Sequence, residues 1–212
     1  MSRAYEITKR IIDVLVSTLV LLITAPICLV IAGLIKLDSS GPVLYVHPAV
    51  GKDGREFFVC KFRTMRVGSN NTKHRRAVIE NMKERKPTGL DKQGWPIFKT
   101  SLIDERSVTR VGKYLRRISL DEFPQFWNVL RGEMSLVGPR PALPYEAMLY
   151  SERQRERFQV LPGITGLYQV TARNRVPIED MIRIDLQYIQ RRSLAHDLWI
   201  IARTPGAMLR GV

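Results

Sequence analysis

Cysteine and histidine are both scarce in this chain of 212 residues, which contains two of the first and three of the second. The two cysteines, Cys28 and Cys60, cannot form a disulfide framework, and neither stands in the spacing of a metal site. This usage excludes a small disulfide-stabilised scaffold and indicates a reducing, cytoplasmic setting. The sequence also lacks internal repeats, low-complexity tracts and linkers, so we expect one functional unit.

Acidic side chains are few relative to basic ones: 20 aspartates and glutamates stand against 34 lysines and arginines, a formal net charge of +14. An excess of this size predicts an anionic partner, because a strongly basic surface attracts negative charge. Nucleic acid, an anionic membrane face and phosphorylated small molecules all meet this requirement. The composition by itself therefore leaves these three classes of partner open.

Charge is absent from residues 14–35, which form an apolar run of 22 residues. A run of this length can cross a bilayer as a helix. It is too long for an ordinary signal peptide and has no convincing cleavage site after it, and a buried core helix is seldom apolar on every face. Asp13 stands at the edge of the run, where we interpret it as an ion pair with Lys9 or Arg10 one helical turn away.

Pro26 lies near the middle of this run and removes one hydrogen bond from any helix that contains it. We therefore expect the helix to break or kink there. Basic residues flank the run on both sides, with Lys9 and Arg10 before it and Lys36 after it, so a single span would have no preferred orientation. A helix that enters from the cytoplasm, bends at Pro26 and returns to the same face satisfies both observations. We favour this re-entrant helix-break-helix over a straight span that tolerates its proline.

The rest of the chain predicts a mainly α fold with a small β-hairpin. Residues 43–47 and 55–62 have the composition of strands, and Asp53-Gly54 between them is suited to a tight turn. The polar stretch 67–96 is where we expect variation or motion. Helices are expected at 72–86, 107–117, 119–131, 145–158, 178–190 and 194–202, with glycine- and proline-rich loops at 138–144 and 162–166.

The adjacent carboxylates Asp121 and Glu122 are the densest chemical signal in the sequence. One interpretation is structural: with Ser119 as the N-cap of a helix, Glu122 completes a capping box. This explains Glu122 well and Asp121 poorly, since Asp121 would gain only a small stabilisation from the helix dipole. The other interpretation is chemical, because adjacent ionised carboxylates suit a Mg²⁺ ligand and a nucleophile. From the residues alone, both interpretations of Glu122 stay open.

A phosphoryl-transfer site also needs cationic groups for the phosphate oxygens. Lys61 and Arg63 alternate along a predicted strand and so point to one face. Arg140 lies on a stiff glycine- and proline-rich loop, and Arg173 is close to Arg175 in the sequence. Each of these is a weak signal alone, because surface cations are usually solvated. A structural interpretation is also the better one for the three histidines, His47, His74 and His196.

Sequence blocks follow one another along nearly the whole chain: KRIID (9–13), IKLDSSGPV (35–43), KFRTM (61–65), SVTRVGKYLRR (107–117), SLDEFPQFWNVLRGEMSLVGPRP (119–141), RFQVLPGITGLYQVTARN (157–174) and a tail with Asp185, Tyr188, Asp197 and Thr204. In these blocks the chain resembles the bacterial sugar transferases. These are the monotopic polyprenyl-phosphate phosphoglycosyl transferases that begin exopolysaccharide, O-antigen, capsule or glycoprotein glycan assembly. The block at 119–141 is the most specific, whereas the tail alone would be weak.

The resemblance implies a re-entrant membrane helix in residues 1–38 and a compact cytosolic α/β catalytic domain in residues 39–212, on the cytoplasmic face of the bacterial inner membrane. It implies a Mg²⁺-dependent dyad in which Asp121 attacks the β-phosphorus of a UDP-sugar and releases UMP. The phosphosugar then passes to polyprenyl (undecaprenyl) phosphate. Glu122 would hold the metal or manage protons, and the resemblance leaves that choice open. Positions suited to phosphate binding match Lys61, Arg63 and Arg140, with Arg117 and Arg173 as weaker matches.

The sequence departs from the family pattern at two places. The family often has serine before the helix-breaking proline, where this chain has Ala25, with Thr24 as a substitute hydroxyl. After the first strand the family commonly has arginine where this chain has Ala49, so one expected cation is missing. The chain also lacks the additional N-terminal transmembrane helices of larger members and resembles the minimal catalytic form.

Two other classes compete with the transferase. A nucleic-acid-binding protein would use the positive charge for a phosphate backbone, yet it predicts neither a long apolar run nor carboxylates paired among the cations. A non-catalytic module at a membrane surface would bind anionic lipid with the same basic residues. Asp121 distinguishes it from the transferase, because only in the transferase should replacing Asp121 with asparagine abolish UMP release. The partners we expect are a UDP-sugar, polyprenyl phosphate and an anionic lipid membrane, without nucleic acid. The oligomeric state, including a homo-oligomer, stays open.

Overall fold

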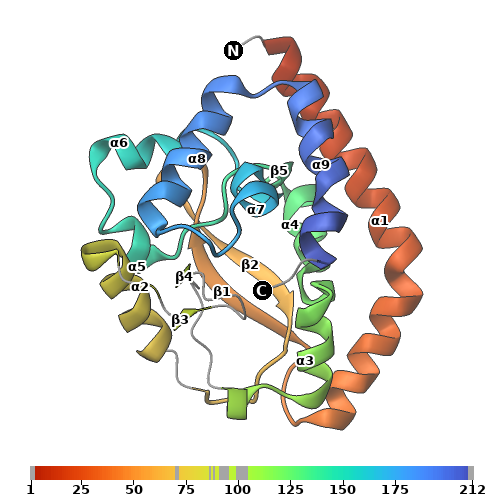
Figure 1. The fold of residues 1–212 in the computed structure, drawn as a ribbon. Helices are drawn as coiled ribbons and strands as arrows, with labels where there is room; N and C mark the ends of the chain where they lie inside the picture. The colour runs from red at the N-terminus through yellow and green to blue at the C-terminus, as the bar shows by residue number, and fades with distance from the viewer. Residues whose placement is uncertain are drawn as a thin grey trace.

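The computed structural model describes residues 3–69, 72–85, 87, 89–90, 96–98 and 105–209. These residues form a mainly helical body with three two-stranded sheets and one long helix along its side (Figure 1). The helices are α1 (Arg3–Asp38), α2 (Thr72–Glu84), α3 (Arg110–Arg117), α4 (Gln125–Arg131), α5 (Pro144–Ala147), α6 (Glu152–Arg155), α7 (Leu167–Thr171), α8 (Ile178–Arg191) and α9 (Leu194–Leu209). The strands are β1 (Leu44–Val50), β2 (Glu56–Phe62), β3 (Gly89–Leu90), β4 (Pro96–Ile97), β5 (Ser135–Val137) and β6 (Gly163–Thr165).

The N-terminal helix α1 carries the apolar run that the sequence assigns to a membrane. Within the described residues it is the one helix long and apolar enough to cross a bilayer. Many of its large apolar side chains are exposed, and Leu22 and Leu29 are 70 % and 75 % exposed. The core helix of a water-soluble protein would hide such side chains, so their exposure along α1 favours lipid as the surrounding medium.

Helix α1 continues through Pro26, where the sequence predicts a break or a kink. The expected break is wrong for this structure, in which α1 bows along the body as one element (Figure 1). A proline removes only one hydrogen bond, and the bonds on either side of it can hold the helix together. The Thr24 hydroxyl also donates to the Val20 carbonyl at 2.7 Å, a contact of the kind that bends a helix without ending it. The re-entrant path of the chain stays a prediction.

The predicted β-hairpin is present. Strands β1 and β2 pair antiparallel, with Leu44 opposite Phe62 at the open end. In the turn, Asp53 and Gly54 have φ angles of 58° and 72°, which aspartate tolerates and glycine adopts freely. Strand β1 extends to Val50, beyond its predicted end, because the pairing with β2 continues up to the turn.

A parallel pair of short strands, β5 and β6, joins the two glycine- and proline-rich loops. Ser135 lies opposite Gly163, and the Gly138 N–H donates to the Thr165 carbonyl at 2.9 Å. A Cβ atom on Gly163 would come within 2.1 Å of the Gly138 nitrogen, so only glycine permits this approach. The sequence does not predict this pairing, because strands of three residues are too short to show an alternation.

Two predicted helices in the second half of the body, 145–158 and 194–202, have different bounds in the structure. The helix expected over 145–158 is divided into α5, α6 and a 3-10 turn, Glu156–Gln159. Ser151 begins a new helix there, because its hydroxyl and the Gln154 side chain form a reciprocal capping box. Helix α9 runs past its predicted end to Leu209, with Pro205 inside it.

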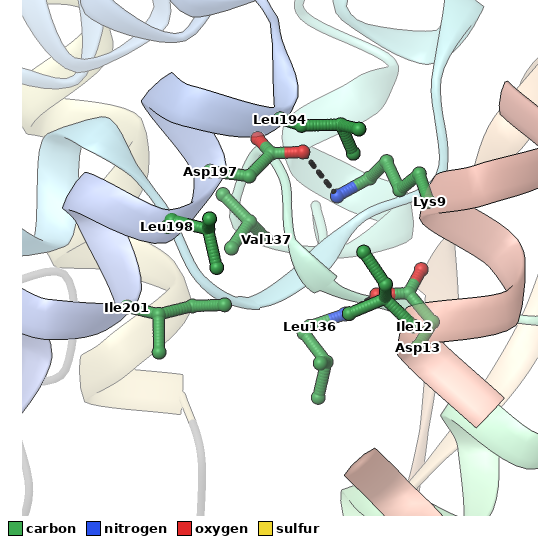
Figure 2. A pocket seen from close by; sticks show the side chains of 9 residues that line it. All are labelled: Lys9, Ile12, Asp13, Leu136, Val137, Leu194, Asp197, Leu198 and Ile201. Carbon is green, nitrogen blue, oxygen red and sulfur yellow. Dashed lines mark hydrogen bonds and ion pairs between the residues drawn. The ribbon is translucent and has the colours of Figure 1, made fainter. Parts of the chain in front are cut away.

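Polar side chains near the start of α1 fasten this helix to the body. The Lys9 ammonium lies 2.9 Å from the Asp197 carboxylate on α9 (Figure 2). Arg10 donates to two backbone carbonyls at the end of α4, and the buried Asp13 accepts from the Leu136 N–H at 3.1 Å. The predicted ion pair of Asp13 with Lys9 or Arg10 is therefore wrong, because each side chain reaches another element instead.

Candidate active site

Asp121 and Glu122 lie in a 3-10 turn, Leu120–Glu122, between α3 and α4. The preceding residue, Ser119, has a left-handed backbone with φ of 55°, and its side chain caps no backbone N–H. Helix α4 begins only at Gln125. The predicted capping box is wrong, because an N-cap residue needs extended backbone and Ser119 does not have it. Helix capping therefore no longer explains Glu122.

Glu122 instead pairs with Lys61 on β2, with 3.0 Å between Lys61 Nζ and Glu122 Oε1. Asn128 on α4 ties this helix to the strand: its amide donates to the Phe58 carbonyl at 2.7 Å and accepts from the Cys60 N–H at 3.1 Å. Asn128 is buried, so water does not compete for these bonds. These bonds fix the distance between β2 and the turn Leu120–Glu122, so that Lys61 reaches Glu122.

The two adjacent carboxylates have different electrostatic environments. Burial and the neighbouring charge of Glu122 raise the pKa of Asp121 above its ordinary value, against the opposing charges of Lys61 and Arg116. Burial would raise the pKa of Glu122 as well, but nearby cations, Lys61 foremost, lower it below the ordinary value of a glutamate. Adjacent carboxyls whose pKa values are pushed apart are suited to two different roles.

Arg140 extends from the loop after β5, and buried charges support it. Its guanidinium lies 3.2 Å from the carboxylate of Glu146, which is fully buried. Burial is the largest single effect and disfavours the charge on Arg140, but Glu146, Tyr150 and Tyr168 together outweigh it and raise the pKa of Arg140. Arg157 donates to the Arg140 backbone carbonyl at 2.8 Å and pairs with Asp185 at 2.6 Å. A guanidinium fixed in this way is preorganised to bind an anion such as phosphate.

A cavity of about 580 Å³ connects these groups and has the size of a ligand site. One part of its wall is apolar and comes from α1, α4 and α9. The structure thus brings the two carboxylates together with three of the predicted cations and one further arginine. The charged lining residues are Lys61, Arg116, Asp121, Glu122, Arg140 and Arg173.

Two predicted phosphate-binding residues, Arg63 and Arg117, do not line this cavity. Arg63 is buried and donates to the carbonyls of Ser39 and Ser40, just beyond α1, where free carbonyls favour a cation. The structure does not bring Arg63 to the cavity, because β2 ends before it and the alternation that would place it beside Lys61 stops one residue too early. Arg117 is exposed on α3.

Arg116 lines the cavity where the sequence predicts Arg117. Helical spacing could have found it: Arg116 lies one turn after the buried Gly112, whereas Arg117 lies one turn after the exposed Lys113. Burial lowers the pKa of Arg116, and the charge of Asp121 opposes that effect. The carboxylates and this arginine therefore stabilise one another's ionised forms.

Strand β1 contributes His47 to the cavity wall. Ala49, where the family commonly has arginine, is fully buried against Phe57 and Val129. That position belongs to the core here, and the structure offers no cation from it. His196 lies on α9 next to Trp199, away from this cavity.

The donor set limits the metal that this site can hold. Among the described residues, no three or more histidine, cysteine or acidic side chains come together to ligate a metal. Mg²⁺ does not require such a cage, because it usually takes one or two carboxylates, several waters and substrate phosphates. Asp121 and Glu122 fit that pattern, since both face a cavity whose cations attract phosphate. The site can therefore bind a diphosphate, share a Mg²⁺ with it and present a carboxylate nucleophile.

A family model described as bacterial sugar transferase matches residues 4–211 of this chain. The exopolysaccharide production protein ExoY of Sinorhizobium fredii is 37% identical over 198 residues, which cover 93% of this chain and 84% of that protein. The undecaprenyl-phosphate galactose phosphotransferase of Salmonella typhimurium is 34% identical over 98% of this chain and 42% of its own length. The undecaprenyl-phosphate glucose phosphotransferase of Komagataeibacter xylinus is 40% identical over 92% of this chain and 35% of its own length.

This chain thus spans most of the ExoY protein and less than half of the two longer relatives. The match to the family model runs from the start of α1 to the end of α9 and includes the carboxylates and cations of the cavity. The chain therefore belongs to the bacterial sugar transferase family.

Proposed function

We propose that this protein transfers a phosphosugar from a UDP-sugar to undecaprenyl phosphate, releasing UMP and giving undecaprenyl-diphosphate-sugar. As a phosphoglycosyl transferase it begins the assembly of a bacterial exopolysaccharide or capsule. The observation that carries this proposal is one cavity that joins Asp121, Glu122 and four cations to the apolar helix α1. The names of two relatives support it, since both contain undecaprenyl phosphate together with galactose or glucose.

In the first step, a carboxylate oxygen of Asp121 attacks the β-phosphorus of the UDP-sugar. The bond from this phosphorus to the bridging oxygen breaks, and that oxygen leaves with UMP and its electron pair. Lys61, Arg116 and Arg140 line the same cavity, so their charges stabilise the negative charge that develops on the phosphate oxygens and on the leaving group. The product of this step is a phosphosugar bound covalently to Asp121.

In the second step, a phosphate oxygen of undecaprenyl phosphate attacks the same phosphorus. The bond to Asp121 breaks, the carboxylate is regenerated, and a diphosphate links the sugar to the lipid. The acceptor phosphate is already ionised at neutral pH, so the step consumes no co-reactant. The same cations serve both steps, because each step passes through similar charge at the same phosphorus.

Glu122 is the better candidate for holding Mg²⁺, because the cations around it lower its pKa and keep it ionised. Asp121 would contribute as a second ligand while its carboxylate stays available for the attack. When bound, Mg²⁺ supplies positive charge to the phosphate oxygens of the donor. This division of roles follows from the opposite pKa directions of the two carboxyls.

Membrane association follows from the apolar helix α1 and from a family that transfers sugars to lipid carriers. We further propose that α1 is re-entrant in the bilayer and that the catalytic residues face the cytoplasm at the inner membrane, because basic residues flank the apolar run on both sides. Cysteine labels placed before Lys9 and after Ser40 should then both react from the cytoplasmic side. Labelling from opposite sides of the membrane would show a straight span instead.

The direct test is UMP release by the purified protein in detergent, with undecaprenyl phosphate, Mg²⁺ and a panel of UDP-sugars. We expect turnover with one or a few sugars, with UDP-glucose and UDP-galactose as the first candidates. Chelation by EDTA should abolish turnover and added Mg²⁺ should restore it, because Mg²⁺ would supply positive charge to the phosphate oxygens of the donor. Absence of UMP with every donor, together with retardation of DNA at physiological salt, would favour the nucleic-acid-binding alternative.

Lys61→Gln and Arg63→Gln are expected to separate catalysis from folding. Lys61→Gln should lower kcat/KM for the UDP-sugar by about 100-fold, since it removes a cation from the cavity wall. The Tm should change little, because the Lys61 side chain is partly exposed. Arg63→Gln should lower the free energy of unfolding by about 2–3 kcal/mol, because the buried Arg63 guanidinium is lost and the Ser39 and Ser40 carbonyls keep only weaker partners, while kcat/KM stays near the parent value. Steady-state kinetics and thermal unfolding measure both quantities, and similar losses of kcat/KM in both variants would contradict the placement of Arg63.

A further inference from the structure

The cavity that holds the two carboxylates is also bounded by the membrane helix. Val16 and Val20, one turn apart on α1, both line it. Their neighbours Leu15 and Leu19 do not line it and are 64 % and 58 % exposed. One face of the apolar helix therefore looks into the active-site cavity, while the adjacent face looks outward. Helix α9 supplies lining residues as well, Ile201, Thr204, Pro205, Ala207 and Met208.

The exposed lining residues show where this cavity meets the outside. Of all the residues that line it, only Val16, Ile201 and Pro205 are exposed, and the rest are buried or half-buried. All three are apolar, and they belong to α1 and α9 alone. The most exposed part of the rim is thus an apolar gap between these two helices, and α1 is the helix that the sequence assigns to lipid.

At the end nearest the start of α1 and the start of α9, polar contacts close this gap. Lys9 on α1 pairs with Asp197 on α9 at 2.9 Å, beside a cavity of only about 10 Å³ that leaves room for little more than one water (Figure 2). Leu136 and Ile201 line both this small cavity and the large one. The Lys9–Asp197 ion pair therefore closes the gap between α1 and α9 at one end. Further along both helices, the gap opens into the active-site cavity.

An acceptor that is both a phosphate and a long hydrocarbon makes two demands on its site. Its phosphate must reach the charged wall near Asp121, and the hydrocarbon next to that phosphate must stay out of water, because exposing apolar surface to water is unfavourable. A path through the polar parts of the rim would carry hydrocarbon through water. The gap between α1 and α9 avoids this, since it is apolar and borders a helix whose outer face exposes large apolar side chains.

We propose that the lipid acceptor enters the active site sideways from the bilayer, through the gap between α1 and α9. Its first isoprene units lie against Val16, Val20, Ile201 and Met208, with the phosphate toward Asp121. This assignment deepens the proposed function and rests on it. The four residues thus form the acceptor subsite, in which Val20 lies beside the cavity and Val16 and Ile201 lie at its mouth.

The first experiment narrows the gap and reads the two half-reactions separately. Val20→Phe and Ile201→Phe place a ring in the gap, and Leu19→Phe places the same ring on the outward face of α1 as the matched control. UMP released in a single burst from UDP-sugar without acceptor reports the first step. Turnover against the concentration of undecaprenyl phosphate reports the second. We expect the two gap variants to raise the KM for undecaprenyl phosphate at least tenfold while the burst stays within twofold of the parent, and Leu19→Phe to change neither.

Three results would overturn the subsite: an unchanged KM in both gap variants, an equal rise in KM in Leu19→Phe, or a burst that falls in parallel with turnover. A parent protein that shows no UMP burst would instead count against the proposed function itself, so the two failures are distinguishable. The unmodified protein provides an independent test. Undecaprenyl phosphate with a photoreactive group in the isoprene unit next to the phosphate should label peptides from both α1 and α9, and labelling confined to other segments would refute the proposal.

Discussion

Replacement of Asp121 by asparagine is expected to abolish UMP release, with a loss on the order of 10⁴-fold in the rate of the first step. Asparagine has nearly the size of aspartate, but its neutral amide cannot act as the nucleophile toward phosphorus. The substitution should leave the fold intact, because Asp121 lies in a short turn outside any capping box. Single-turnover UMP release measures the step, and circular dichroism with thermal unfolding reports the fold.

Asp53→Asn is a suitable control for this substitution, because Asp53 is exposed in the hairpin turn and asparagine also tolerates its positive φ. This control should release UMP at the parent rate. Glu122→Gln should lose less than Asp121→Asn and should need a higher Mg²⁺ concentration for half-maximal rate, since it loses the proposed charged ligand but keeps the proposed nucleophile. Near-native UMP release by Asp121→Asn would show that another group forms the covalent intermediate or that none forms.

The largest expected loss of stability comes from Arg157→Met. The Arg157 guanidinium pairs with Asp185 at 2.6 Å and donates to the Tyr150 hydroxyl and the Arg140 carbonyl, and both side chains of the ion pair are 1 % exposed. Removing it leaves a buried carboxylate without its counter-charge, which costs about 3–5 kcal/mol. In a chain of this size that loss lowers Tm by about 6–20 °C, measured by thermal unfolding in detergent.

The double variant Arg157→Met with Asp185→Leu distinguishes a buried ion pair from general damage to packing. Removing both charges eliminates the unpaired carboxylate, so the double variant should recover a large part of the Tm lost in Arg157→Met. Its kcat/KM should stay low, however, because the Arg140 backbone still lacks the bond that holds it. Additive losses in the double variant would contradict a direct coupling between Arg157 and Asp185.

Several features of this protein could be predicted because they depend on residues close together in the chain. The length of the apolar run predicts α1, the turn chemistry of Asp53-Gly54 predicts the hairpin, and helical spacing predicts α8 within one residue of its observed end. Asp121 and Glu122 stand out for the same reason, as neighbours in sequence. The grouping of Lys61, Arg140 and Arg173 with them is only a weak expectation from the residues, and the family resemblance strengthens it.

Local patterns also misled at identifiable places. Strand alternation grouped Arg63 with Lys61, although β2 ends before Arg63 and the side chain turns to carbonyls beyond α1. The sequence around Ser119 has the form of a capping box, but the fold holds Ser119 in a left-handed conformation that a cap cannot adopt. At Arg63, contacts with the carbonyls of Ser39 and Ser40 replace the expected strand pattern, and at Ser119 the left-handed backbone forgoes a cap worth about 1 kcal/mol.

By itself the sequence determined the kind of protein: an apolar membrane helix, a basic chain and a carboxylate pair in the motif of one enzyme family. Only the tertiary structure decided what those parts meet. Glu122 pairs with a lysine 61 positions away, and the gap between α1 and α9 joins residues at opposite ends of the chain. The physical reason is that periodicity and propensity act over a few residues, whereas ion pairs, glycine contacts and cavity walls depend on the path that brings distant segments together.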